Sequence, residues 1–211
     1  EEEEEDVEVN NLYQKPHIAY GWKSIDFLYG QKVLRTPTLN HELNTVPDYH
    51  FFSSLQYFGV SMTHGLRWNG RFNGLNYFSY TQVLPQKIAY NDSISAWLTG
   101  GNFYLTVIGF DLFYYKPKID FMIGFGFNTG RLRLLGDPLI KQKNPYFTPT
   151  LTIAPRYFIG DISLQIRASI DYDISSENWR RMTFSKSDKV NIGPTSMTGI
   201  NVFFAIGYKM P

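Results

Sequence analysis

Residues 119–130, IDFMIGFGFNTG, alternate between two kinds of side chain. Every second residue from Ile119 to Phe127 is bulky and apolar, whereas the residues between them, from Asp120 to Asn128, are mostly glycine or polar. Successive side chains of a β-strand point to opposite faces, so the pattern predicts a strand with two different faces. Segments 145–158, 161–173 and 198–210 repeat the alternation.

Turn signals divide the rest of the chain into similar segments. Asn69-Gly70 is typical of a type I′ hairpin turn, and FYYKPKID and RYFIGDIS provide two more short connections. Long polar stretches at 29–50, 85–99, 131–144 and 174–197 lie between these hairpins. The sequence therefore predicts an all-β fold of eight antiparallel strands at 17–28, 52–68, 71–84, 101–114, 119–131, 145–158, 161–173 and 198–210. Segment 101–114 is apolar in both registers, which a bulge or large interior side chains would explain.

Composition excludes several classes of protein. Aromatic residues make up 17% of the 211 residues and charged residues 18%, a profile that favours strands. No apolar run approaches the ~20 residues of a transmembrane helix. The absence of cysteine excludes disulfides and thiolate metal sites. Seven of the first eight residues are acidic, so residues 1–12 are expected to be an N-terminal tail, followed by a single barrel domain at 13–211.

The long amphipathic strands fit either a soluble barrel or a transmembrane barrel. Strand length, small side chains in the polar register and short turns alternating with long loops favour a transmembrane barrel, with its apolar register toward lipid. The residues expected to face lipid are Ile119, Phe121, Ile123, Phe125, Phe127, Leu151, Ile153, Leu164, Ile166, Ile170, Val202, Phe204 and Ile206. A soluble lipocalin-like barrel that binds small hydrophobic ligands is the alternative fold.

In its long amphipathic strands, short turns and long loops, the chain resembles the small outer-membrane β-barrel superfamily, which includes the OmpA/OmpX-like and PorT-like eight-stranded barrels. The resemblance rests on the strand pattern over 13–211 and on the amphipathic terminal strand FFAIGYKMP. It implies an up-and-down barrel in the outer membrane of a Gram-negative bacterium. It also implies short periplasmic turns, long extracellular loops and periplasmic N- and C-termini. The acidic tail would then lie in the periplasm, where a basic partner protein is one candidate contact.

The polar register places both signs of charge inside the predicted barrel. A buried charge is costly unless it is paired and hydrogen-bonded, so we expect a lumenal ion-pair network. Its expected members are Asp120, Arg156, Asp161, Arg167, Asp171 and Lys209. Eight strands enclose an interior that side chains just fill, so the lumen is expected to be closed.

The residues that could carry chemistry are few. Ser61 and His64 in SMTHG are three residues apart and would face opposite sides of a strand, which argues against a catalytic pair. His41, Glu42 and His50 lack the spacing of a helical zinc motif, so no metal or cofactor is expected. Nothing resembles a nucleic-acid-binding module. The basic residues expected to contact lipopolysaccharide phosphates are Arg131, Arg133, Lys141 and Lys143.

These features predict a non-enzymatic outer-membrane barrel with a closed lumen. It would act as a structural or interaction component, as a subunit or accessory of a larger complex for assembly, secretion or uptake. Its expected partners are outer-membrane lipid, lipopolysaccharide and other outer-membrane or periplasmic proteins. The alternatives are a lipid A-modifying enzyme, which needs a His, Ser or Asp cluster at the lipid-facing rim, and a soluble binder, which needs an apolar lumen.

Overall fold

The computed structural model describes most of the chain as β-structure. The described residues are 18–34, 54–68, 72–91, 94–113, 118–136, 140–175, 178–181 and 195–210. The predicted acidic tail at 1–12, together with His17, His41, Glu42 and His50, lies outside the described residues. In the described part of the chain no helix is long and apolar enough to cross a membrane.

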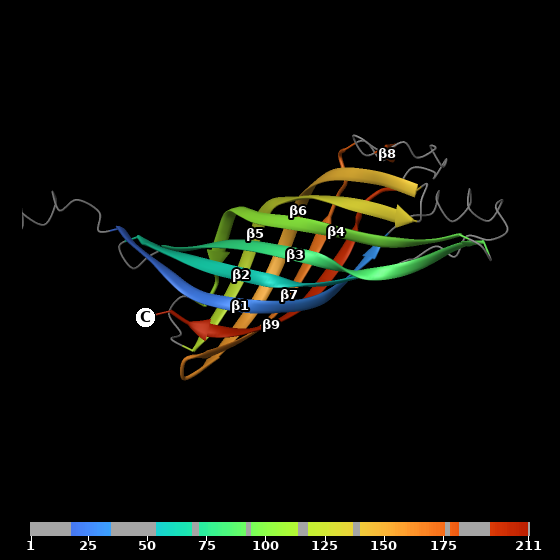
Figure 1. Ribbon diagram of the computed structural model, residues 1–211. Coiled ribbons are helices and arrows are strands. Elements are labelled where there is room, and N and C mark those ends of the chain that lie inside the picture. Colours follow the sequence, from blue (N-terminus) through green and yellow to red (C-terminus); the bar gives the residue numbers. More distant parts are fainter. Residues whose placement is uncertain are drawn as a thin grey trace, which may run out of the picture.

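Eight long strands form a closed antiparallel barrel (Figure 1). They are β1 (Ile18–Leu34), β2 (Ser54–Trp68), β3 (Phe72–Asn91), β4 (Ile94–Asp111), β5 (Ile119–Gly136), β6 (Ile140–Ile159), β7 (Ile162–Asp171) and β9 (Gly199–Lys209). Neighbours in sequence pair with each other, and β1 pairs with β9 to complete the ring. The two-residue strand β8 (Arg180–Arg181) pairs with β6 near its start, beyond the last residue of β7. The predicted eight-stranded meander is therefore confirmed.

Two predicted loops are instead extensions of the barrel wall. Residues 85–91 and 94–99 were expected in a loop, but β3 and β4 pair as far as Asn91 and Ile94. Residues 131–144 were likewise expected in a loop, but β5 and β6 pair as far as Gly136 and Ile140. The β3–β4 hairpin projects beyond the barrel at the end opposite the C-terminus (Figure 1). The backbone pairs of these hairpins form even though their sequence is polar and contains proline, as loop sequences often do.

The two faces of each strand differ as the alternation requires. In β7 and β9, buried and exposed side chains alternate for most of the strand length. Every residue expected to face lipid lies on the outer surface, half-buried or exposed, and Phe204, for example, is 59% exposed. An apolar outer surface around a polar interior is the reverse of a soluble barrel and is the arrangement required in a bilayer.

The unclear alternation of β4 has both of the causes considered above. The register of β4 against β5 shifts between Thr106 and Ile108, so the adjacent residues Val107 and Ile108 both face outward, 49% and 53% exposed. Tyr104 is a large aromatic side chain that is buried inside the barrel. The bulge and the interior tyrosine together make both registers of this strand apolar.

The lumen is filled at the end that carries the β3–β4 and β5–β6 hairpins, here called the long-loop end. A buried apolar cluster occupies it, in which no member is more than 6% exposed. Its members are Leu28, Leu34, Leu55, Tyr57, Val83, Leu98, Leu132, Leu134, Tyr146, Trp179, Met197, Phe203 and Ala205. Trp179 and Met197 come from the chain that links β7 to β9, and the Trp179 indole donates a 2.8 Å hydrogen bond to Thr195 Oγ1. The polar registers of β5–β7 therefore do not describe the whole lumen, which is apolar at this end.

Candidate functional site

A network of buried charges fills the lumen near the opposite, short-turn end. Arg156 Nη2 lies 3.2 Å from Asp26 Oδ2 and donates a 2.6 Å hydrogen bond to Thr63 Oγ1. Asp26 also accepts hydrogen bonds from Ser24 and Ser163. Asp26 is 1% exposed and Arg156 2%, so the ion pair is shielded from solvent. We call this group and its neighbours the short-turn ion cluster.

A bulge in β1 adds a second cation to the short-turn ion cluster. The register of β1 against β2 shifts between Trp22 and Ser24, at Lys23. Lys23 Nζ lies 3.0 Å from Asp120 Oδ1 and 3.8 Å from Asp111 Oδ2. Asp120 Oδ2 is 4.0 Å from Arg156 Nη1, so the two ion pairs are connected. The cluster links β1, β4, β5 and β6 across the barrel.

Two residues expected in the lumenal network lie outside it. Asp161 is exposed at the β6–β7 turn, where its backbone carbonyl accepts a 2.6 Å hydrogen bond from Lys209 N. Lys209 is also exposed, with Nζ 5.5 Å from the centroid of the Phe158 ring. Asp161 lies in the β6–β7 turn and Lys209 is the last residue of β9, so both side chains are exposed at the rim of the barrel, and including Asp161 and Lys209 in the network was wrong.

Arg167 occupies the middle of the lumen without an ion pair to a described residue. Its guanidinium carbon lies 4.5 Å from the ring centroid of Phe203, 4.7 Å from that of Tyr77 and 5.1 Å from that of Tyr104. Its Nη1 donates a 3.1 Å hydrogen bond to Ser79 Oγ. The electron-rich faces of aromatic rings attract a cation, which replaces the carboxylate partner expected from the sequence.

Asp171 has a cationic partner that the sequence analysis did not identify. Lys32 Nζ lies 2.5 Å from Asp171 Oδ2. The same carboxylate accepts hydrogen bonds from Asn128, Asn201 and Thr150 at 2.8–3.0 Å. The apolar cluster, the Lys32–Asp171 pair, the aromatic rings around Arg167 (the Arg167 box) and the short-turn ion cluster therefore all occupy the lumen, and Phe203 belongs both to the apolar cluster and to the Arg167 box.

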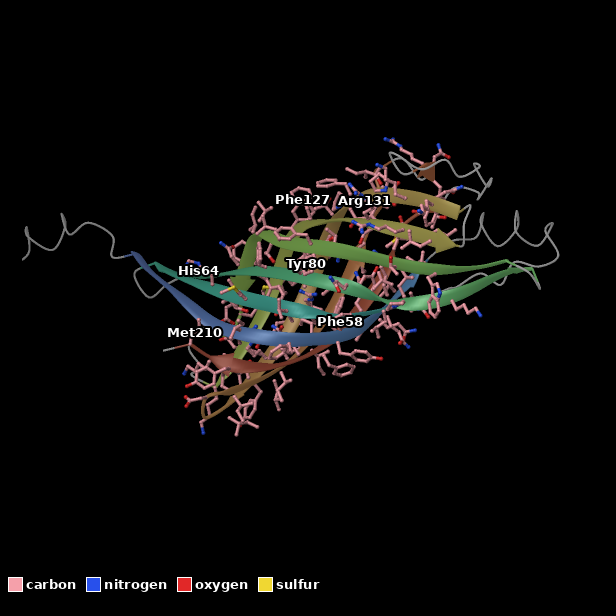
Figure 2. All side chains as sticks on the ribbon, in the orientation of Figure 1. Phe58, His64, Tyr80, Phe127, Arg131 and Met210 are labelled. Atoms are coloured by element: carbon pink, nitrogen blue, oxygen red, sulfur yellow. The ribbon has the colours of Figure 1, made fainter. Side chains whose placement is uncertain are left out.

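The strand-2 pair does not form a catalytic site. Ser61 is buried in the lumen, where its hydroxyl is 2.7 Å from the Tyr77 hydroxyl, whereas His64 lies in the outward register. Figure 2 shows His64 and Met210 toward the short-turn end, away from the end that carries Arg131. Over the described ranges no three His, Cys, Asp or Glu residues are grouped as metal ligands.

The outer surface at the long-loop end carries a group of basic residues. Arg133 of β5 is directly opposite Lys143 of β6, and Lys143 is directly opposite Arg180 of β8. Three cations thus lie side by side across adjacent strands. Arg131 and Lys141 lie two residues away in the same outward registers. We call Arg131, Arg133, Lys141, Lys143 and Arg180 the basic belt.

The basic belt is not neutralised by the described part of the chain. The acidic residues described are Asp26, Asp111, Asp120, Asp161, Asp171 and Asp173, all of which are in the lumen, at the short-turn end or buried under the β7–β9 connection. No ion pair among the described residues includes a member of the belt. Like charges directly opposite each other destabilise a sheet, so the arrangement costs stability unless an anion binds there. The belt is therefore the candidate functional site.

Sequence reasoning missed Asp26, Lys32 and Arg180. Polar residues at 24, 26 and 32 alternate with apolar residues at 25, 27 and 33, but the first strand was expected to end at residue 28. Extending that register would have placed Lys32 in the lumen. Arg180 fell within a predicted loop, and no local pattern distinguishes a two-residue strand.

The fold and its two faces define the chain as an eight-stranded β-barrel of the transmembrane type. Among solved structures, the chain is similar to Ail, the attachment invasion locus protein of Yersinia pestis, solved in complex with the heparin analogue sucrose octasulfate. The match covers 90% of this chain and 99% of that one, with a TM-score of 0.51 and 9% sequence identity. No protein-family model and no curated protein matches the sequence.

Proposed function

We propose that this chain is a non-enzymatic interaction barrel that binds the phosphates of lipopolysaccharide through its basic belt. The observation that carries the proposal is the row Arg133–Lys143–Arg180, three cations placed abreast with no carboxylate between them. Arginine can bind a phosphate through two parallel hydrogen bonds, and lysine adds a point charge. The likeness to a barrel solved with a polysulfated sugar supports a polyanionic ligand.

This proposal also sets the orientation of the barrel. The long-loop end, which carries the belt, faces the cell exterior, where lipopolysaccharide occurs. The short turns and both termini then lie in the periplasm. The packed lumen supports a role in interaction rather than in transport, and the opposite facing of Ser61 and His64 supports a role without catalysis.

Calorimetric titration with deacylated lipopolysaccharide that keeps its phosphates tests the belt. The double variant Arg133→Gln, Lys143→Gln should bind at least about tenfold more weakly, because charge-assisted hydrogen bonds contribute roughly 1.5–3 kcal/mol each. Lys118→Gln, Lys209→Gln removes the same charge from exposed positions at the short-turn end and should bind like the wild type. Equal affinity for the belt variant and the wild type would contradict the proposal.

We further propose, as the sequence suggested, that the barrel is a subunit or accessory of a larger outer-membrane complex. Support comes from the lumen, which buried side chains fill among the described residues, so that the outer surface and the projecting hairpins remain for contacts with other molecules. Extraction of native membranes in mild detergent, followed by affinity purification, should yield a partner protein in fixed ratio. Recovery of the barrel with lipid alone would reject the subunit role and leave lipopolysaccharide binding untouched.

A further inference from the structure

A groove of about 760 Å³ crosses the outer surface beside the basic belt. Its central row consists of residues directly opposite one another on neighbouring strands: Phe58, Gln82, Gly101, Arg131 and Pro145. Gly101 is the only member of this row without a side chain. The missing side chain makes a notch between Gln82 on β3 and Arg131 on β5. Figure 2 shows Phe58, Tyr80 and Arg131 around this part of the barrel wall.

Aromatic side chains form the wall of the groove on the side toward the short turns. Tyr80 is directly opposite Phe103 in the adjacent row. The Tyr80 hydroxyl lies 3.1 Å from the position that a Cβ on Gly101 would take, so the end of this side chain reaches into the notch and partly covers it. Gln82 Nε2 donates a 3.2 Å hydrogen bond to this hydroxyl and holds it in place. Tyrosine with one polar end is typical of the level where lipid tails meet headgroups.

Cations lie beside the notch and on its long-loop side. Arg131 and Arg133 both line the groove, and Arg133 belongs to the row of three cations with Lys143 and Arg180. From the short-turn side to the long-loop side, the groove therefore has an aromatic row with Tyr80 and Phe103, a central row that is open at Gly101 and has Arg131 beside the opening, and a row that contains Arg133. An amphiphile that is apolar at one end and anionic at the other matches this order.

We propose that the groove binds one acyl chain of a phosphorylated glycolipid of the lipid A type, with its phosphate held by Arg131 and Arg133. This inference rests on the proposed function of the basic belt and adds the lipid part of the ligand. The notch spans two strand spacings, or about 10 Å, whereas a helix with its side chains is about 10–12 Å across. An extended hydrocarbon chain enters such a notch and a partner helix does not. A soluble polyanion would use the cations and leave the aromatic wall without a function.

The test fills the notch and leaves the cations in place. Gly101→Leu puts a side chain where the three nearest atoms to the new Cβ all belong to the movable end of Tyr80, so the barrel should fold. Gly21→Leu is the matched control, because a Cβ on this exposed glycine meets nothing within 4 Å. The shift in gel mobility on heating checks that each variant is folded. If Gly101→Leu does not fold, Gly101→Ala fills the notch with a smaller side chain.

Each variant is placed in phosphatidylcholine nanodiscs that contain intact lipopolysaccharide, and native mass spectrometry measures how much lipopolysaccharide stays bound. Gly101→Leu should retain about tenfold less than the wild type, the equivalent of about two methylene groups no longer buried. Gly21→Leu should retain as much as the wild type. Deacylated lipopolysaccharide should bind to Gly101→Leu with unchanged affinity.

The outcomes separate the two proposals. Unchanged retention by Gly101→Leu, or an equal loss in Gly21→Leu, would overturn the acyl-chain groove while the belt is judged by its own charge variants. A loss of deacylated lipopolysaccharide binding in Gly101→Leu would also overturn it, because the filled notch would then disturb the cations. If the belt variants bind deacylated lipopolysaccharide normally, the proposed function fails, whatever the groove does.

Discussion

Lys32 Nζ lies 2.5 Å from Asp171 Oδ2, and the two side chains are 2% and 0% exposed. They are 139 residues apart in sequence and join β1 to β7 across the intervening strand β9. Asn128, Asn201 and Thr150 add hydrogen bonds to the same carboxylate. The pair therefore connects the strands near the point where the two ends of the chain close the barrel.

Removing one partner of this pair should cost more stability than removing both. Lys32→Met leaves Asp171 as an uncompensated buried charge, and we expect a loss of about 3–5 kcal/mol in the free energy of unfolding. Lys32→Met, Asp171→Asn removes both charges and should recover most of that loss. Urea unfolding in detergent, followed by tryptophan fluorescence, measures both variants. A double variant no more stable than the single one would show that charge burial does not govern this site.

Arg156 has two carboxylate neighbours that differ in distance. Asp120 is directly opposite Arg156 on β5, but Asp26 is closer to Arg156, at 3.2 Å against 4.0 Å, and Asp120 has Lys23 at 3.0 Å. The stability lost in Arg156→Met should therefore be recovered better by adding Asp26→Asn than by adding Asp120→Leu, because Asp120→Leu removes the nearest carboxylate of Lys23. Melting temperatures in one detergent compare the two double variants. Better rescue by Asp120→Leu would mean that Asp120 is the main partner in solution.

The strand count and the facing of the strands were predictable because they depend on local alternation. A period of two over ten or more residues is visible in the sequence, and it correctly places Phe125 outward and Gly126 inward. The Asn69-Gly70 turn gave the β2–β3 connection for the same reason.

The ion-pair partners Lys23, Asp26 and Lys32 were not predictable, because their contacts depend on register between strands that are distant in sequence. A bulge at Lys23 turns that side chain toward Asp120, and no single-strand pattern contains this information. Similarly, the basic belt depends on Arg180 pairing beside Lys143. Alternation identifies which face a residue occupies, whereas contacts across the lumen require the closed ring.

Arg167 should tolerate loss of its charge better than Lys32 does. No described carboxylate is paired with Arg167, so Arg167→Met leaves no orphan anion and places an apolar side chain among Tyr77, Tyr104 and Phe203. The expected cost is about 0.5–2 kcal/mol, the range of a cation–π contact, and thus below that of Lys32→Met. Urea unfolding of both variants side by side tests this order. The reverse order would indicate that Arg167 neutralises an acidic group.

Lipid contact should follow the alternation of β5. Phe125 is 43% exposed on the outer surface, and Phe125→Arg should cost about 2–4 kcal/mol if it lies near the bilayer midplane. Because the chain has no cysteine, spin labels can be attached one at a time at introduced cysteines. Labels at 123, 125 and 127 should be quenched by lipid-soluble reagents. A Cβ on Gly126 would lie so close to the Leu105 carbonyl that a side chain there should overpack the lumen. The inward labels are therefore placed at 122 and 128, which are buried, and they should be shielded. The opposite quenching pattern would reject the membrane orientation.

The lumen should conduct no steady current, because buried side chains fill it along its length. The apolar cluster, the Lys32–Asp171 pair, the Arg167 box and the short-turn ion cluster all occupy the lumen. Planar-bilayer recordings of the wild type should therefore show no stable open level. Arg167→Ala removes the cation of the Arg167 box and leaves the other groups in place, so this variant should show no steady conductance either. A porin-sized conductance in the wild type would contradict the closed eight-stranded barrel. A steady conductance in Arg167→Ala alone would show that Arg167 is the single barrier and that ions pass the other groups of side chains in the lumen.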